Sequence, residues 1–284
     1  MFFVKKVLLT ILSSNADMYR ELTEVQVKGY EMWLKQQPMD IDILVYTAGE
    51  KTELIGNTLY VACNDNSIYA KTRALTEYII KHPEYDVIIN TNACTVVNLE
   101  FINKFVNDDN MYEMAKEYFI GHVMVELIGQ EWAMLTGTFM MCDRKLFMDH
   151  LSDISRYDKY NEYISCSSYH PADTYNDKGD TQWEGASNDA IWSKMMIDDG
   201  VSFLILPSIS TRNKDYIWAT NYDDTFKLNI SPIYDQHFEI PYDERRIVEP
   251  ITMKLAFMAM MNHHITTDEY ATILSKILYN YNSK

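Results

Sequence analysis

Hydrophobic and polar positions alternate along the first ninety residues in a way that predicts strands and helices in turn. Four apolar runs predict buried strands, and two segments with apolar residues three or four positions apart predict helices. His82-Pro83 ends the second helix, because the residue before a proline disfavours the helical conformation. The expected strands cover residues 4–13, 41–46, 58–62 and 85–89, and the expected helices cover 18–37 and 68–81.

This alternation implies a largely parallel sheet covered by helices. In such sheets, ligands bind outside the carboxyl ends of the strands. The residues at and just after the carboxyl ends of the expected strands are therefore the first place to look for function. They are residues 10–15, 47–50, 63–66 and 90–95.

The second half of the chain has a less regular pattern. The segment 132–142 predicts a strand broken at Gly137, and Asp143 is the expected N-cap of the helix that follows. The polar segment 152–184 shows no period and is expected to be a long loop over a site. The other expected elements are helices over 143–151, 187–197 (capped by Ser187 or Asn188), 245–262 and 267–281, and a strand over 201–206.

Composition narrows the class of protein. A length of 284 residues with 47% hydrophobic residues suits one large α/β domain. Residues 1–13 are too short for a signal peptide and lack its cleavage site, and no run has the roughly 18 apolar residues of a membrane span. Four cysteines without paired spacing are typical of reduced thiols in a cytoplasmic protein.

Several common sites are excluded by missing motifs. The chain has no Gly-x-Gly-x-x-Gly after its first strand, no Gly-Lys-Ser/Thr phosphate loop and no Gly-x-Ser-x-Gly elbow. The pair His263-His264 has no acidic partners at metal-ligand spacing, so it is interpreted as structural or a surface feature. A dinucleotide cofactor is therefore not expected.

Residues 58–106 carry the most informative pattern. Lys71-Thr72 lies in the first turn of the expected helix 68–81, residues 85–89 are the expected strand that begins Tyr-Asp, and residues 91–95 and Val97-Asn98 follow it. This order and spacing resemble the inverting GT-A glycosyltransferases of the β-1,3-galactosyltransferase kind and their viral and bacterial relatives.

Three later segments are similar to motifs of the same family. Residues 135–139 resemble the segment that lines the donor sugar and acceptor, which implies a place for Gly137 in the sugar site. Residues 187–191 resemble the motif that supplies the catalytic base, which implies that Asp189 is that base. His237-Phe238, followed by Arg245, resembles a stretch that reaches the diphosphate.

The resemblance implies a Rossmann-like GT-A fold of the α/β class: a mostly parallel central sheet flanked by helices, with C-terminal helices. It implies a single domain over 1–284, with a nucleotide-binding half over 1–100 and an acceptor-side half over 101–284. The implied activity is transfer of a sugar, with inversion, from a nucleotide sugar to a hydroxyl. A UDP-sugar is the first expectation for the donor.

One departure from the family concerns the metal. Most of these enzymes place Asp-x-Asp after the fourth strand to hold Mn²⁺ or Mg²⁺, whereas this chain has Asn90-Thr91-Asn92. Amide oxygens are weaker ligands for such cations than carboxylates. Either the metal is held less tightly, with Asn92 and His237 as candidate ligands, or cationic side chains replace it.

The candidate donor site follows from the strand ends and the resemblance together. Thr10, Ser13 and the turn 47–50 are expected at the nucleobase and ribose, and Asn90 and Asn92 beside the ribose and diphosphate. The leaving diphosphate needs positive charge, because negative charge develops there in the transition state. The candidates for this role are Lys71, Arg73, His237 and Arg245.

The acceptor stays open between two kinds of molecule. The 17 methionines and 21 tyrosines, with short Asn/Asp turns, are typical of large-phage proteins, which suggests a hydroxymethylated base in phage DNA. A surface glycan or lipid-linked sugar is the alternative. A DNA acceptor needs a basic strip, for which Arg144, Lys145, Arg212 and Lys214 are candidates, but the net charge of -16 counts against it.

Two other classes of function are alternatives to a glycosyltransferase. The missing Asp-x-Asp also suits a binding protein that has the fold without catalysis. A sugar nucleotidyltransferase on a similar sheet would need a Gly-rich first loop with a basic residue, and residues 12–15 do not supply one.

Overall fold

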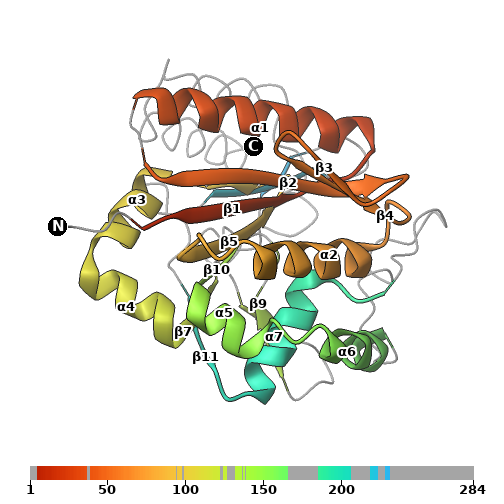
Figure 1. Cartoon of the computed structure of the whole chain (residues 1–284), viewed down its shortest axis with the longest axis vertical. Helices are drawn as coiled ribbons and strands as arrows, with labels where there is room; N and C mark the ends of the chain where they lie inside the picture. Colours follow the sequence, from red (N-terminus) through yellow and green to blue (C-terminus); the bar gives the residue numbers. More distant parts are fainter. Residues whose placement is uncertain are drawn as a thin grey trace, which may run out of the picture.

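The computed structural model describes residues 5–36, 39–93, 95–97, 99–121, 124–126, 132–135, 137, 139–165, 185–205, 218–222 and 228–230. Within this part, the main feature is an eight-stranded sheet with helices on both faces (Figure 1). Its strands are β1 (Val7–Leu12), β2 (Ile41–Gly49), β3 (Glu53–Ile55), β4 (Thr58–Ala62), β5 (Val87–Asn92), β7 (Tyr118–Gly121), β10 (Phe139–Asp143) and β11 (Ser202–Ile205).

Seven helices and two small sheets complete the described part. The helices are α1 (Asp17–Gln36), α2 (Ile68–Lys81), α3 (Leu99–Asn107), α4 (Asp109–Glu117), α5 (Arg144–His150), α6 (Ser155–Ser165) and α7 (Asn188–Asp198). One small sheet holds β6 (Thr95–Val96), β12 (Trp218–Tyr222) and β13 (Leu228–Ile230), and the other holds β8 (Met124–Glu126) and β9 (Ala133–Leu135).

The large sheet is mostly parallel, in the order β11-β7-β10-β5-β1-β2-β4-β3. The strands β5, β1, β2 and β4 are parallel neighbours, and β10 lies antiparallel between β5 and β7. From β1 the chain adds β2 and β4 on one side and then returns to place β5 on the other. The strand order therefore reverses between β1 and β5, which is where open α/β sheets bind ligands.

The two faces of the sheet are distinct. Alternate residues of a strand point to opposite faces, so Leu8 and Thr10 share one face and Leu9 and Ile11 the other. Leu8 belongs to the core that includes apolar residues of α2, α5, α6 and α7. Figure 1 shows α1 on one side of the sheet and α2, α5 and α7 on the other. Asn90 and Asn92, which pair with Thr10 and Leu12, lie on the same α2 and α7 side as Leu8.

The α/β architecture with a mostly parallel sheet and flanking helices confirms the general prediction. Asp143 is the N-cap of α5 as predicted, since its side chain accepts a 2.6 Å hydrogen bond from Lys145 N. The predicted strand over 132–142 is divided into β9 and β10, which belong to different sheets. The predicted helices over 245–262 and 267–281 lie outside the described residues.

The prediction of a loop over 152–184 was wrong for its first part, which contains α6. This helix is polar overall, but Tyr157, Tyr160 and Ile164 are buried three and four positions apart. Their spacing places them on one face of the helix, against the core. In the described part, no helix is long and apolar enough to cross a membrane.

Candidate functional site

The carboxyl ends of β1 and β5 lie side by side at one edge of the large sheet. The segment before β10 and the start of α7 also reach this edge. Because β10 is antiparallel to β5 and pairs Phe139 with Thr91, it begins at this edge. Gly137, two residues before β10, therefore lies beside the end of β5, and the first turn of α7 reaches the same place. We call Asn92, Gly137, Asn188 and Asp189 the strand-end site.

Hydrogen bonds to the backbone of Gly137 hold this site together. Gly137 N donates to Asp189 Oδ2 at 2.8 Å, and Asn92 Nδ2 donates to Gly137 O at 3.4 Å. Asp189 Oδ1 accepts from Ala190 N at 2.9 Å. The structure thus brings together three residues that the sequence placed in the site: Asn92, Gly137 and Asp189.

The environment of Asp189 changes its acidity. Burial raises the pKa of its carboxyl, although hydrogen bonds from the Ser187 side chain and from the backbone of Gly137 and Ala190 act in the opposite direction. A carboxylate with a raised pKa is a stronger proton acceptor. The location at the start of a helix, which by itself favours the charged form, is outweighed by desolvation.

A glycine at position 137 permits this close approach. A Cβ built there would lie 3.3 Å from Asp189 Oδ2 and 3.4 Å from Asn188 Oδ1, which is tighter than ordinary van der Waals contact. Gly137 is not one of the glycines with a positive φ angle. A glycine is needed there because a larger side chain would crowd Asp189 and Asn188, and not because of the backbone conformation.

Beneath the strand-end site lies a buried polar trio of Thr10, Tyr46 and Asn90. Asn90 Oδ1 accepts from Thr10 Oγ1 at 2.8 Å and from Tyr46 OH at 2.8 Å. Thr10 and Asn90 were expected to contact the nucleotide, but each lies two residues before the end of its strand, β1 or β5, and both are fully buried. Burial mainly raises the pKa of Tyr46, and the charge of Asp189 adds to it, so Asp189 lies within electrostatic reach of the trio.

Lys71 joins the loops that follow β1 and β4. Its Nζ donates to Ser13 O at 3.2 Å, Asp65 O at 2.5 Å and Asp65 Oδ1 at 3.0 Å, and the side chain is 2% exposed. Asp65 Oδ2 accepts from Ser14 Oγ at 2.5 Å and Asn15 N at 2.9 Å. These contacts use all three N–H groups of the ammonium. Lys71 therefore shapes the expected nucleobase region, and a contact with diphosphate stays a prediction.

The pKa of Asp65 shows that this loop connection is electrostatically favourable. Burial alone would raise it, but the hydrogen bonds from Ser14 and Lys71 and the charge of Lys71 hold it below its ordinary value. Asn15 extends the connection to β2, because its Nδ2 donates to Ala48 O at 3.4 Å. The three loops expected to contact the nucleotide are thus linked to one another.

The remaining predicted residues lie elsewhere. Arg73 contacts Glu77 and Asp158, so it points toward α6 instead of the strand ends. Ser13 Oγ lies 2.7 Å from Thr23 Oγ1 in a buried hydrogen bond. His237 and Arg245 lie outside the described residues. Within the described ranges, no group of three or more His, Cys, Asp or Glu side chains is placed to hold a metal ion.

The proposed basic strip beside the cleft was wrong for Arg144 and Lys145. Asp143 pairs with Val87, the first residue of β5, so α5 begins at the edge opposite the strand-end site. Arg144 Nη1 donates to His82 O at 2.9 Å, and Lys145 pairs with Asp149. Arg212 and Lys214 lie outside the described residues.

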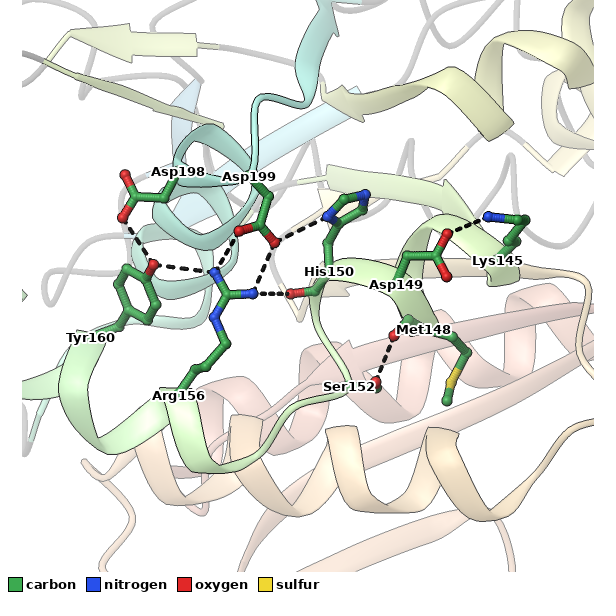
Figure 2. A network of polar contacts seen from close by, with 9 residues as sticks. All are labelled: Lys145, Met148, Asp149, His150, Ser152, Arg156, Tyr160, Asp198 and Asp199. Atoms are coloured by element: carbon green, nitrogen blue, oxygen red, sulfur yellow. Dashed lines mark hydrogen bonds and ion pairs between the residues drawn. The ribbon is translucent and has the colours of Figure 1, made fainter.

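A polar cluster that the sequence did not reveal fixes the other end of α7 (Figure 2). Arg156 of α6 donates two 2.8 Å hydrogen bonds to the carboxylate of Asp199, which directly follows α7. His150 Nδ1 lies 3.0 Å from Asp199 Oδ2, and the Arg156 guanidinium is the main cause of the lowered pKa of Asp199. This cluster connects α5, α6 and α7, and so supports the helix that carries Asp189.

A comparison with protein-family models gives no match for this chain, and a comparison with curated proteins gives none either.

Proposed function

We propose that this protein is a glycosyltransferase that moves a sugar from a nucleotide sugar to a hydroxyl acceptor, with Asp189 as the general base. The observation that carries the proposal is the carboxylate of Asp189, which is held by the Gly137 backbone at the carboxyl ends of β1 and β5 and has a raised pKa. Proton removal from an acceptor hydroxyl needs such a positioned base.

The linked loops after β1, β2 and β4 support a nucleotide site next to this base. Lys71 and Asp65 hold the loops after β1 and β4 in one arrangement, and Asn15 connects them to the end of β2. A preorganised loop region lowers the ordering cost of binding a ligand. The strand order reverses beside these loops, which is the usual place for a nucleotide in an α/β sheet.

The proposal includes a GT-A type fold and an inverting outcome, both of which follow from the family resemblance. Inversion requires one displacement, with Asp189 on the far side of the anomeric carbon from the diphosphate. A UDP-sugar is the expected donor. The positions of Arg144 and Lys145 weaken the support for a DNA acceptor, so a glycan acceptor is favoured.

One observation favours a second function, nucleotide-sugar binding without catalysis. Asn90 occupies the first position of the family's acidic motif, and its side-chain oxygen accepts from Thr10 and Tyr46 inside the sheet. An oxygen used in this way is not directed at a metal-bound diphosphate. A protein of this class would bind the donor and release no product.

A thermal-shift screen of nucleoside diphosphates and nucleotide sugars, with and without Mn²⁺, tests the proposal. A ligand that binds only the folded state stabilises it by about 2.7 kcal/mol at one hundred times its Kd, and so raises the melting temperature. We expect a clear shift with one nucleoside diphosphate and its sugars. Unchanged melting with all of them at millimolar concentration would refute both functions.

A further inference from the structure

The start of α7 holds a buried amide that the fold does not use. Asn188 is the first residue of α7 and is 4% exposed. Among the residues that the structure describes, its Nδ2 has no hydrogen-bond partner. Native structures seldom keep an unpaired buried donor, because it loses its bond to water and gains nothing in return. Asn188 therefore has a hydrogen bond available for a ligand.

The Oδ1 end of this amide lies near the same point as the carboxylate of Asp189. The position that a Cβ on Gly137 would take is 3.4 Å from Asn188 Oδ1 and 3.3 Å from Asp189 Oδ2. Asn90 Nδ2, on the same side of the sheet, is likewise unpaired within the described ranges. Asn92 of β5 donates to Gly137 O, so polar groups from β5 and α7 meet next to Gly137.

We propose that Asn188 selects the transferred sugar, by donating a hydrogen bond from Nδ2 to a hydroxyl oxygen on the sugar ring of the donor. This inference rests on the proposed function. Asn188 is buried, whereas Asp189 keeps some exposed surface, so we expect Asn188 to be reached by the part of the ligand that enters furthest. The acceptor hydroxyl then meets Asp189 from the solvent side.

The chemistry of the two side chains suits a polyhydroxylated ring. An amide N–H donates to a hydroxyl oxygen, and a carboxylate oxygen accepts from a hydroxyl proton. A site that is built to bind a hydroxyl discriminates strongly against an analogue that lacks it, because the polar group of the site is then left unpaired. Asn188 is therefore a specificity-determining residue, distinct from the base.

Calorimetric titration of UDP-glucose and UDP tests this role, with GDP-glucose and GDP as a second pair. We expect Asn188→Leu to lower the affinity for the nucleotide sugar about tenfold and to leave the affinity for the nucleoside diphosphate unchanged. The melting temperature should not fall, because the substitution removes an unpaired donor. Asn188→Ala provides the same comparison if leucine disturbs α7.

Two controls test whether the effect is specific to Asn188 and to one hydroxyl of the sugar. Gln26→Leu removes another buried amide, 1% exposed and unpaired in the described residues, from α1 on the opposite side of the sheet, and it should change neither affinity. Monodeoxy forms of UDP-glucose should identify one hydroxyl whose removal weakens wild-type binding but has no effect in Asn188→Leu.

The experiment distinguishes a failure of the role of Asn188 from a failure of the proposed function. An unchanged sugar affinity in Asn188→Leu, or an equal loss for sugar and diphosphate, would overturn the role of Asn188 and leave the proposed function intact. A wild-type protein that binds none of the four ligands, and none of the nucleotides and nucleotide sugars of the thermal-shift screen, would overturn the proposed function and this inference together.

Discussion

The substitution Gly137→Ala tests how closely the base is held. The added Cβ would lie 3.3 Å from Asp189 Oδ2, 3.4 Å from Asn188 Oδ1 and 3.5 Å from Asp189 Cγ. The carboxylate and the amide must move apart by a few tenths of an ångström, and the 2.8 Å hydrogen bond from Gly137 N to Asp189 must lengthen or bend.

The effect on stability should be small. Overpacking of this kind costs about 1 kcal/mol. The φ angle of Gly137 suits an alanine, which restricts the unfolded chain and returns about 0.5 kcal/mol. We therefore expect the free energy of unfolding to fall by about 1 kcal/mol or less.

The effect on turnover should be larger than the effect on stability. A displacement of about 1 Å can cost about a hundredfold in rate, so a few tenths should cost about tenfold. The assay is the steady-state release of nucleoside diphosphate from the donor, together with urea unfolding of the same samples.

Gly200→Ala is the control for Gly137→Ala. Gly200 follows α7 at φ +77 and has no atom within 4 Å of a built Cβ, so alanine there strains the backbone far from the base. It should lower stability by about 1 kcal/mol without changing turnover. Turnover within twofold of the wild type in Gly137→Ala, or an equal loss in both variants, would refute the reasoning.

Three further predictions concern stability. Lys71→Met should lower the free energy of unfolding by about 2 kcal/mol, because Ser13 O and the Asp65 carboxylate lose a buried donor; an unchanged urea midpoint would contradict this. The pKa of Asp199 is lowered, so its stabilising contribution is present above the unfolded pKa of about 4 and is lost as the pH falls through the folded value. The difference in urea midpoint between wild type and Asp199→Asn should therefore shrink from pH 7 to pH 3, and a constant difference would argue against the ion pair. The pKa of Asp189 is raised, so its contribution is full below the unfolded pKa and is lost as the pH rises through the folded value. The melting temperature of Asp189→Asn should accordingly rise relative to wild type as the pH increases; the opposite trend would show that the carboxylate is not desolvated.

The sequence predicted the strands and helices of the first ninety residues apart from the short β3, because the strands are apolar runs and the helices have clear apolar faces. The sequence did not predict α6, because tyrosines supply most of its buried face and the segment is polar in composition. It also missed the cluster of Arg156, Asp199 and His150, because an ion pair between residues 43 positions apart has no local signal.

The site was predicted in part. Asn92 was expected in the site from its place after a strand, and Gly137 and Asp189 from the family resemblance; the structure brings the three together, and their roles stay predictions. Thr10 and Asn90 were expected to face a ligand, but whether a polar residue in a strand is buried depends on where the strand ends, which the sequence does not define to within two residues. Asn188 was recognised only as a possible cap, because its unpaired amide is visible only in three dimensions.

The most direct test of the central claim is the release of nucleoside diphosphate from the best-binding nucleotide sugar by wild type and Asp189→Asn. The account predicts that Asp189→Asn keeps the ligand-induced rise in melting temperature and loses about a hundredfold or more in rate. Equal rates for the two proteins would contradict the assignment of Asp189 as the base.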